Sequence, residues 1–282
     1  MRFVEGARRE LARAWPYALV LALGLGAVVV VGANISNAFP SKDRPFGWPG
    51  PASFENAVAM VRPDIVLATT LPALLLGATA LRERDAGFLP ILAVDASLLL
   101  VASFLASFVG LHGSSGGYAD AFVAFACATA LLAGAFWALA LLLGSLLRRH
   151  AVPASLVLWV GFVSIYENAT RTALFRQVGY DGLTAGQFPA WFWVSQALSP
   201  LTAYRGVLIL WRGGFMDYLE KAALAGADMP AWMSPLTFAG VLALWIALPV
   251  AAAGAVLWIR RRPAAAGASA GIGPRTPSEM QP

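Results

Sequence analysis

The stretch AFVAFACATALLAGAFWALALLLGSLL, residues 121–147, carries no charged residue along its whole length. The hydrocarbon core of a bilayer is about 30 Å thick, and a helix of about 20 apolar residues is needed to cross it. Residues 121–147 are long enough for this. The stretch therefore predicts a membrane-spanning helix, and the rest of the chain can be compared with it.

Five further segments resemble this one in length and hydrophobicity. Three of them have no charge, and two contain an acidic residue, Asp95 in one and Glu167 in the other. The segments are Tyr17–Ala33, Ile65–Leu81, Phe88–Leu111, Ala151 to about Phe175, and Leu236–Ile259. Together they predict an all-α polytopic membrane protein with six transmembrane helices.

The composition supports this class. Hydrophobic residues make up 59% of the chain and charged residues 12%, whereas a soluble domain is about half apolar and one quarter charged. The formal net charge of +5 does not indicate nucleic acid binding, because the basic residues lie mostly at the ends of the predicted spans. We therefore expect lipid, not water, around most of the surface.

Basic residues are concentrated in alternate connections between the predicted spans, and these connections all lie on the same side of the membrane. One set of short connections and both chain ends carry Arg2, Arg8, Arg9, Arg13, Arg82, Arg84, Arg148, Arg149, Arg260, Arg261 and Arg262. The connections on the other side carry basic residues more thinly, over longer stretches. Because positive residues favour the cytoplasmic side, both termini are predicted to be cytoplasmic. The protein itself is expected in the cell (inner) membrane.

Ala190–Trp211 is apolar enough to be read as a seventh span. A seventh crossing would place the terminal arginines outside, and Gln196, Pro200 and Arg205 interrupt the segment. We therefore favour an external interfacial or re-entrant helix, with Trp191, Trp193 and Tyr204 at headgroup depth. The predicted regions are an amphipathic entry helix (1–16), the permease domain (17–262) with external loops at 34–63 and about 176–235, and a disordered cytoplasmic tail (263–282).

The first predicted functional segment is the entry helix. At helical spacing, Phe3, Leu11 and Trp15 share one side, and Arg9 and Arg13 lie mostly on the other, so the helix is expected along the cytoplasmic face of the membrane. Glu10 lies at the edge of the apolar stripe, where a carboxylate needs a partner. An arginine of a docked protein or plain solvation would each meet that need.

The second is the loop Arg82-Glu83-Arg84-Asp85-Ala86-Gly87 between two spans. Its alternating charges fit either a small polar knob that docks on a cytoplasmic subunit or a solvated turn. The third is the pair of acids at membrane depth, Asp95 and Glu167, which are candidates for a transport or ion-relay pathway unless they lie near an interface.

Several kinds of chemistry have no matching motif. The chain contains no G-x-x-x-x-G-K-[ST] sequence, so no ATP site of its own is expected. The two histidines, His112 and His150, fall on opposite sides of the predicted membrane, so no metal site is expected. Residues 113–117 match G-x-S-x-G, but a short connector between membrane helices is not the strand-turn-helix setting that this nucleophile motif requires.

Four short motifs, in order along the chain, resemble the ABC-2 type transporter permeases. Ala7-Arg8-Arg9-Glu10-Leu11 is similar to the A-R-[KR]-E-L entry helix, and residues 83–89 to the E-x-x-x-G-[T]-L loop after span two, with Phe88 in place of threonine. Leu198-Ser199-Pro200-Leu201-Thr202-Ala203-Tyr204-Arg205 is similar to the L-N-P-x-x-x-Y-R segment of the NosY-type permeases of nitrous oxide reductase maturation. Residues 226–230, Gly-Ala-Asp-Met-Pro, follow in the same order. The chain departs from the pattern at Pro90–Leu100, which is mostly apolar where the family has a polar stretch.

The resemblance implies an ABC-2, type V exporter-like bundle that acts as an exporter half and works as a homodimer. Each copy would dock on a separate cytoplasmic subunit that binds ATP and Mg²⁺, so the chain itself would be neither an enzyme nor a cofactor binder. The docking residues implied are Arg9, Glu10, Arg13, Arg82, Glu83, Arg84, Asp85 and Gly87. An external or periplasmic accessory protein would contact Tyr204, Arg205 and Asp228, and the cargo would serve copper-site assembly.

Three alternatives remain at this stage. The chain is an ABC-2 permease for an unrelated cargo, a secondary transporter that uses Asp95 and Glu167 as a proton relay, or a membrane enzyme or anchor. The absence of an evident internal repeat argues against the secondary transporter.

Overall fold

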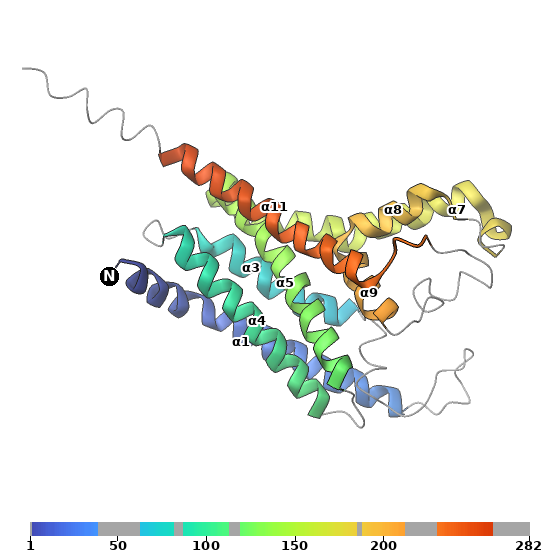
Figure 1. The fold of residues 1–282 in the computed structure, drawn as a ribbon, viewed down its shortest axis with the longest axis horizontal. Coiled ribbons are helices and arrows are strands. Elements are labelled where there is room, and N and C mark those ends of the chain that lie inside the picture. Colours follow the sequence, from blue (N-terminus) through green and yellow to red (C-terminus); the bar gives the residue numbers. More distant parts are fainter. Residues whose placement is uncertain are drawn as a thin grey trace, which may run out of the picture.

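The computed structural model describes residues 2–38, 63–81, 87–112, 119–184, 188–211 and 230–261, and every regular element in these ranges is helical. The α-helices are α1 (Arg2–Ala38), α3 (Pro63–Ala80), α4 (Phe88–His112), α5 (Ala119–Leu147), α6 (Ala151–Val160), α7 (Glu167–Thr184), α8 (Ala190–Leu198), α9 (Pro200–Trp211) and α11 (Pro235–Arg261) (Figure 1). A 3₁₀ turn, η2 (Arg148–His150), joins α5 to α6, and a π-helical segment, η3 (Gly161–Tyr166), joins α6 to α7.

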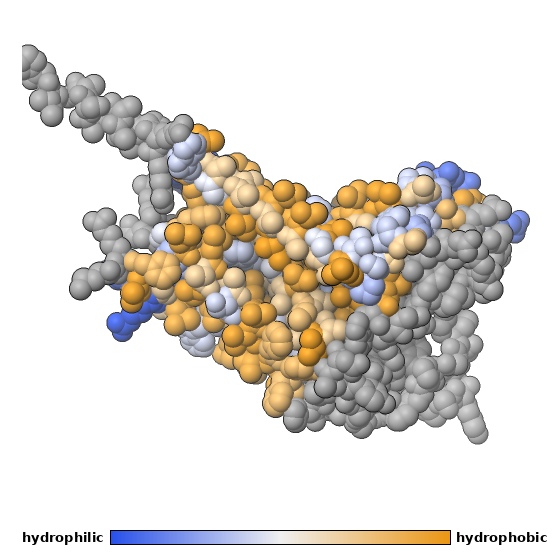
Figure 2. Space-filling model, viewed as in Figure 1, coloured by the Kyte–Doolittle hydropathy of each residue, from blue (hydrophilic) through white to orange (hydrophobic). Residues whose placement is uncertain are grey.

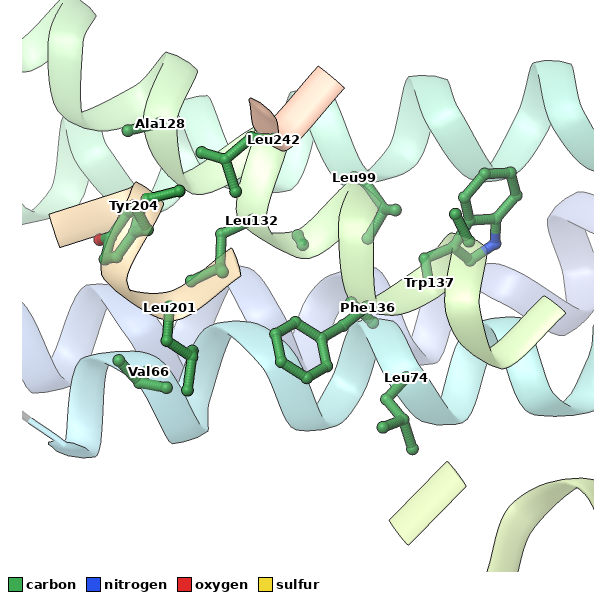
Figure 3. Packing of buried hydrophobic residues seen from close by; sticks show 14 of the residues in the cluster. Val66, Leu74, Leu99, Ala128, Leu132, Phe136, Trp137, Leu201, Tyr204 and Leu242 are labelled. Atoms are coloured by element: carbon green, nitrogen blue, oxygen red, sulfur yellow. The ribbon is translucent and has the colours of Figure 1, made fainter. Parts of the chain in front are cut away.

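Helix α5 lies at the centre of the bundle. It packs against α3, α4, α6, α9 and α11, and its side chains Leu132, Phe136 and Trp137 lie among residues from those neighbours, including Leu74, Leu99 and Tyr204 (Figure 3). All of these side chains are buried. The charge-free run that predicts a span is therefore also the core of the protein.

Small residues let the helices approach closely. A Cβ added to Gly77 of α3 would lie 2.2 Å from the carbonyl oxygen of Trp137 in α5, and one added to Gly206 of α9 would lie 2.6 Å from the ring of Phe238 in α11. Glycine at such crossings allows backbones to come together, which is the main source of helix association where lipid surrounds the protein.

Helices α1 and α4 pack side by side along their length. Gly6 faces Pro90 near the first turns of both helices, and Gly26 faces Val109 farther along each of them, so the two helices run parallel. The outward faces of this pair are apolar: Leu19, Leu23 and Leu105 are among the exposed hydrophobic residues.

The described part of the chain is an all-α, multi-pass membrane protein. Four helical stretches are long and apolar enough to cross a membrane: Phe3–Val31, Phe88–Gly110, Phe122–Gly179 and Pro235–Arg260. The third stretch turns at η2, after which α6 packs back against α5, and α3 is a shorter apolar helix. Hydrophobic residues cover most of the visible described surface (Figure 2).

The two described chain ends, Arg2 and Arg261, lie at the same end of the bundle (Figure 1). Phe88 approaches Gly254 of α11 there, and Arg260 donates to the carbonyl oxygen of Ser145 near the end of α5. This arrangement agrees with an even number of crossings.

Two expectations about helix boundaries need revision. Residues 1–16 are not a separate helix, because α1 continues from Arg2 through Pro16 to Ala38. Ala190–Trp211 is not one helix either: Ser199 is extended (φ −85°, ψ 130°) and separates α8 from α9. Neither piece is long enough to cross a membrane alone. The tail 263–282 and most of the loop 34–63 lie outside the described residues.

Candidate functional site

A buried group of polar side chains connects four helices near the end of the bundle where the chain ends lie. We call it the Arg13 cluster, and it consists of Glu10 and Arg13 of α1, Thr79 of α3, Asp95 of α4 and Trp137 of α5. It is built on a stripe of α1 in which Gly6, Glu10 and Ala14 are buried. Gly6 allows this stripe to lie close to α4, since a Cβ there would be 3.3 Å from Pro90.

The guanidinium of Arg13 contacts three neighbouring groups in addition to its own helix. Nη1 donates to the carbonyl oxygen of Leu76 (3.1 Å) and to Oγ1 of Thr79 (2.7 Å). Nη2 lies 3.2 Å from Oδ2 of Asp95. Nε donates to Oε1 of Glu10 at 2.8 Å, and Nη2 contacts the same oxygen. One side chain therefore bonds α1 to both α3 and α4.

Asp95 has a further donor from the central helix. The indole Nε1 of Trp137 donates to Oδ2 of Asp95 at 2.9 Å. Asp95 is fully buried, Glu10 is 2% exposed, and the Arg13 side chain is 12% exposed. Buried charges are costly unless they are paired and hydrogen-bonded, and here each charged group has a partner.

The charge within the described part of the cluster is unequal: two carboxylates face one guanidinium. An isolated ion transferred into a low-dielectric interior loses several kcal/mol of hydration. Neutral donors help to replace that hydration, and Thr79 and Trp137 provide such groups. The cluster is therefore held by hydrogen bonds as well as by ion pairs, and removal of its only cation would leave two acids unpaired.

The outward face of α1 is apolar around the cluster. Exposed apolar side chains occur along α1 from Phe3 to Val31, a stretch that is long and apolar enough to cross a membrane. Phe3, Leu11 and Trp15 face outward, as expected for an apolar face in contact with lipid, but Glu10 and Arg13 turn into the bundle, which the sequence did not predict. The cause is that lipid accepts the apolar face, whereas the bundle interior offers partners for the charges.

The structure places the predicted docking residues in different surroundings. Glu10 and Arg13 are buried and do not form an exposed surface. Arg9 is exposed and pairs with Glu5 at 2.6 Å, with side chains 54% and 66% exposed. Gly87 lies just before α4, with its carbonyl oxygen accepting from the Ile91 amide (3.4 Å). The remaining four, Arg82, Glu83, Arg84 and Asp85, lie outside the described residues.

The second predicted pathway acid, Glu167, has different surroundings. Its carboxylate is 35% exposed, and Oε1 lies 2.6 Å from Nη2 of Arg171 one turn along α7 and 3.9 Å from Nη1 of Arg205 in α9. The structure does not bring Asp95 and Glu167 into one group. A relay that joins these two acids directly is therefore not present.

The predicted external contact residues also differ in exposure. Tyr204 is fully buried, with its hydroxyl 3.4 Å from Oγ1 of Thr129, so its side chain is not exposed on the surface of the described chain. Trp193 is buried too, whereas Trp191 is exposed and donates to Gln177. Arg205 is 19% exposed, and Asp228 lies outside the described residues.

Sequence reasoning identified Glu10 as unusual and Asp95 as a candidate, but it missed their common partner and Trp137. One available signal was the spacing of Glu10 and Arg13, which places an acid and a base on the same face of one helix. No group of three histidine, cysteine, aspartate or glutamate residues suited to a metal ion occurs within the described ranges.

No protein-family model matches the chain, and no curated protein matches it. The residues and contacts described above are therefore the basis for the functional proposal.

Proposed function

We propose that the chain is the membrane-spanning permease subunit of an ATP-driven transporter, of the ABC-2 type that its short motifs resemble. In this proposal the six apolar segments form the bundle, a second copy completes the pathway, and a separate cytoplasmic subunit binds ATP and Mg²⁺. The multi-pass helical architecture supports the proposal, as does the position of both described chain ends at one end of the bundle.

The observation that carries the proposal is the Arg13 cluster. It joins the first turns of α1 to the end of α3 and the start of α4, the two helices on either side of the charged loop 82–87. A subunit that pulls on this loop would move α3 and α4, and the ion pairs would transmit the movement to α1 and, through Trp137, to the central helix α5. Rigid coupling of this kind suits a bundle that switches between two packed states.

The test is purification of the full chain in mild detergent together with the proteins that accompany it in the cell. The proposal expects an ATPase subunit in equal amount, which is lost on Glu83→Arg. A matched control is Asp181→Arg, a charge reversal at an exposed acid in α7, which should retain the subunit. A chain that purifies alone and transports in liposomes without ATP would contradict the proposal.

The cargo and the external contacts extend the same proposal. The resemblance to NosY-type permeases suggests export for copper-site maturation of nitrous oxide reductase, with an external accessory protein as recipient and the inner membrane as location. Arg205 and Asp228 remain candidates for that contact. An ABC-2 permease with an unrelated cargo would share the coupling residues and differ in this external region.

A second candidate is an ion-coupled secondary transporter, because the described cluster has two carboxylates for one guanidinium. One proton shared by Glu10 and Asp95 would balance the charge. The candidate expects transport driven by a proton gradient in liposomes without any ATPase, abolished by Glu10→Gln or Asp95→Asn. Transport that depends on ATP and survives both substitutions would exclude it.

A further inference from the structure

The turn between α5 and α6 places three exposed residues, Arg148, Arg149 and His150, at the end of the central helix. Arg148 has φ 43°, a left-handed conformation that residues with a side chain rarely adopt. This conformation ends α5 and reverses the chain into α6. It leaves two consecutive arginines at the edge of the bundle.

A third arginine, Arg260, caps the end of α5 at this turn. Arg260 of α11 donates to the carbonyl oxygens of Ser145 and, at 3.2 Å, of Leu146. These belong to the last turn of α5, whose carbonyl groups lack helical partners and favour a cation. Among the described residues, no ion pair or hydrogen bond engages the guanidinium of Arg148 or Arg149, so both charges are available to another molecule.

Exposed apolar side chains precede these charges in both helices. Leu146 and Leu147 precede Arg148 and are 46% and 43% exposed, and Trp258 and Ile259 precede Arg260 and are 57% and 61% exposed. An apolar surface that continues up to a row of arginines is typical of the boundary between hydrocarbon and headgroups, where tryptophan is also enriched.

We propose that the end of α5, with Leu146, Leu147, Arg148 and Arg149, binds an anionic phospholipid next to the end of α11, where Trp258 is exposed. The two free guanidinium groups contact the phosphate and the negative headgroup, and the leucines and the indole lie along the acyl chains. Each basic residue near a membrane surface adds to the attraction for anionic lipid, so two should enrich it on the order of 30-fold over a zwitterionic lipid. The inference stands independently of any transport activity.

The test uses the full chain in phosphatidylcholine vesicles that contain either brominated phosphatidylglycerol or brominated phosphatidylcholine at equal mole fraction. Bromine quenches nearby tryptophan fluorescence, and the contribution of Trp258 is the difference between the wild type and Trp258→Phe. We expect stronger quenching of Trp258 by the phosphatidylglycerol. The preference should disappear in the double variant Arg148→Gly, Arg149→Gln, in which glycine suits the positive φ and preserves the turn.

The matched control is Arg171→Gln with Arg176→Gln, two exposed arginines of α7, which should keep the preference. Equal unfolding midpoints of the variants in detergent verify that the turn is intact. Inorganic phosphate without acyl chains is not expected to displace the lipid. A preference that persists in the Arg148 and Arg149 variant would overturn the proposal. So would an unchanged preference combined with loss of a bound protein subunit, which would assign these arginines to protein docking.

Discussion

The Arg13 cluster and the group around Glu167 contain the same kinds of charge in opposite settings. In the first, Arg13 joins Glu10 to Asp95, which lies 82 positions away, and the acids are almost fully buried. In the second, Glu167 pairs with Arg171 one helical turn away and remains 35% exposed. An ion pair that joins distant helices in a low-dielectric interior supports the fold, whereas a local, hydrated pair contributes little.

Among the substitutions that separate these two groups, replacement of Arg13 should lower the stability of the protein most. Arg13→Gln leaves two buried carboxylates without a cation among the described residues, so we expect a loss of about 3–5 kcal/mol in the free energy of unfolding. Thermal or denaturant unfolding in mild detergent measures it. Arg171→Gln is the control and should cost at most about 1 kcal/mol, the value for exposed pairs. Equal losses for the two variants would show that the buried cluster is not structurally important.

The glycine crossing beside the cluster gives the second prediction. In Gly77→Ala the new Cβ would lie 2.2 Å from the backbone oxygen of Trp137, so α3 and α5 must separate, at a cost of about 3 kcal/mol, the upper end of the usual range for overpacking. The same unfolding measurement applies. Gly24→Ala in α1 meets no atom within 4 Å and should leave stability unchanged or raise it by up to about 1 kcal/mol. A neutral Gly77→Ala would contradict the close crossing.

The indole hydrogen bond gives the third prediction. Trp137→Phe keeps an aromatic ring in the core but removes one of the two donors to Asp95 Oδ2, so we expect a loss of about 1.5–3 kcal/mol, the range for a hydrogen bond to a charged group. Unfolding of this variant is compared with Trp191→Phe, which removes an indole donor from an exposed contact with Gln177. If both cost the same, the bond to Asp95 adds no stability.

The exposed pair at Glu167 should show the smallest effect. Glu167→Gln is expected to change the free energy of unfolding by at most about 1 kcal/mol at low salt. The difference from the wild type should vanish at 1 M salt, where the Debye length is about 3 Å. A large, salt-independent loss would place Glu167 in the same class as Asp95.

The four long apolar helical stretches could be predicted from sequence because a run of apolar residues of this length has few other uses. The interruption of Ala190–Trp211 was also readable, since Pro200 cannot continue a hydrogen-bonded helix from the preceding residues. In the structure the helix is broken at Ser199, directly before that proline. These features depend on local composition, which the sequence contains directly.

The burial of the polar side of α1 in the bundle could not be predicted from local composition. In a soluble protein the apolar side of a helix faces the core, but a helix in lipid can bury its polar side when the interior offers partners. That choice depends on Asp95 and Trp137, which belong to other helices. The pairing of Arg13 with Asp95 requires the parallel packing of α1 and α4, and no local pattern encodes that arrangement.

The break at Ser199 has a consequence for the order in which the protein assembles. Helix α9 is too short to enter the bilayer as an independent span, yet its residues Ala203 and Tyr204 are completely buried between α5 and α11. Because α5 precedes α9 in the chain and α11 follows it, α9 has one packing surface when it is synthesised and gains the other only when α11 has been made. Ala203 and Tyr204 therefore become fully buried only after α11 has packed against the bundle.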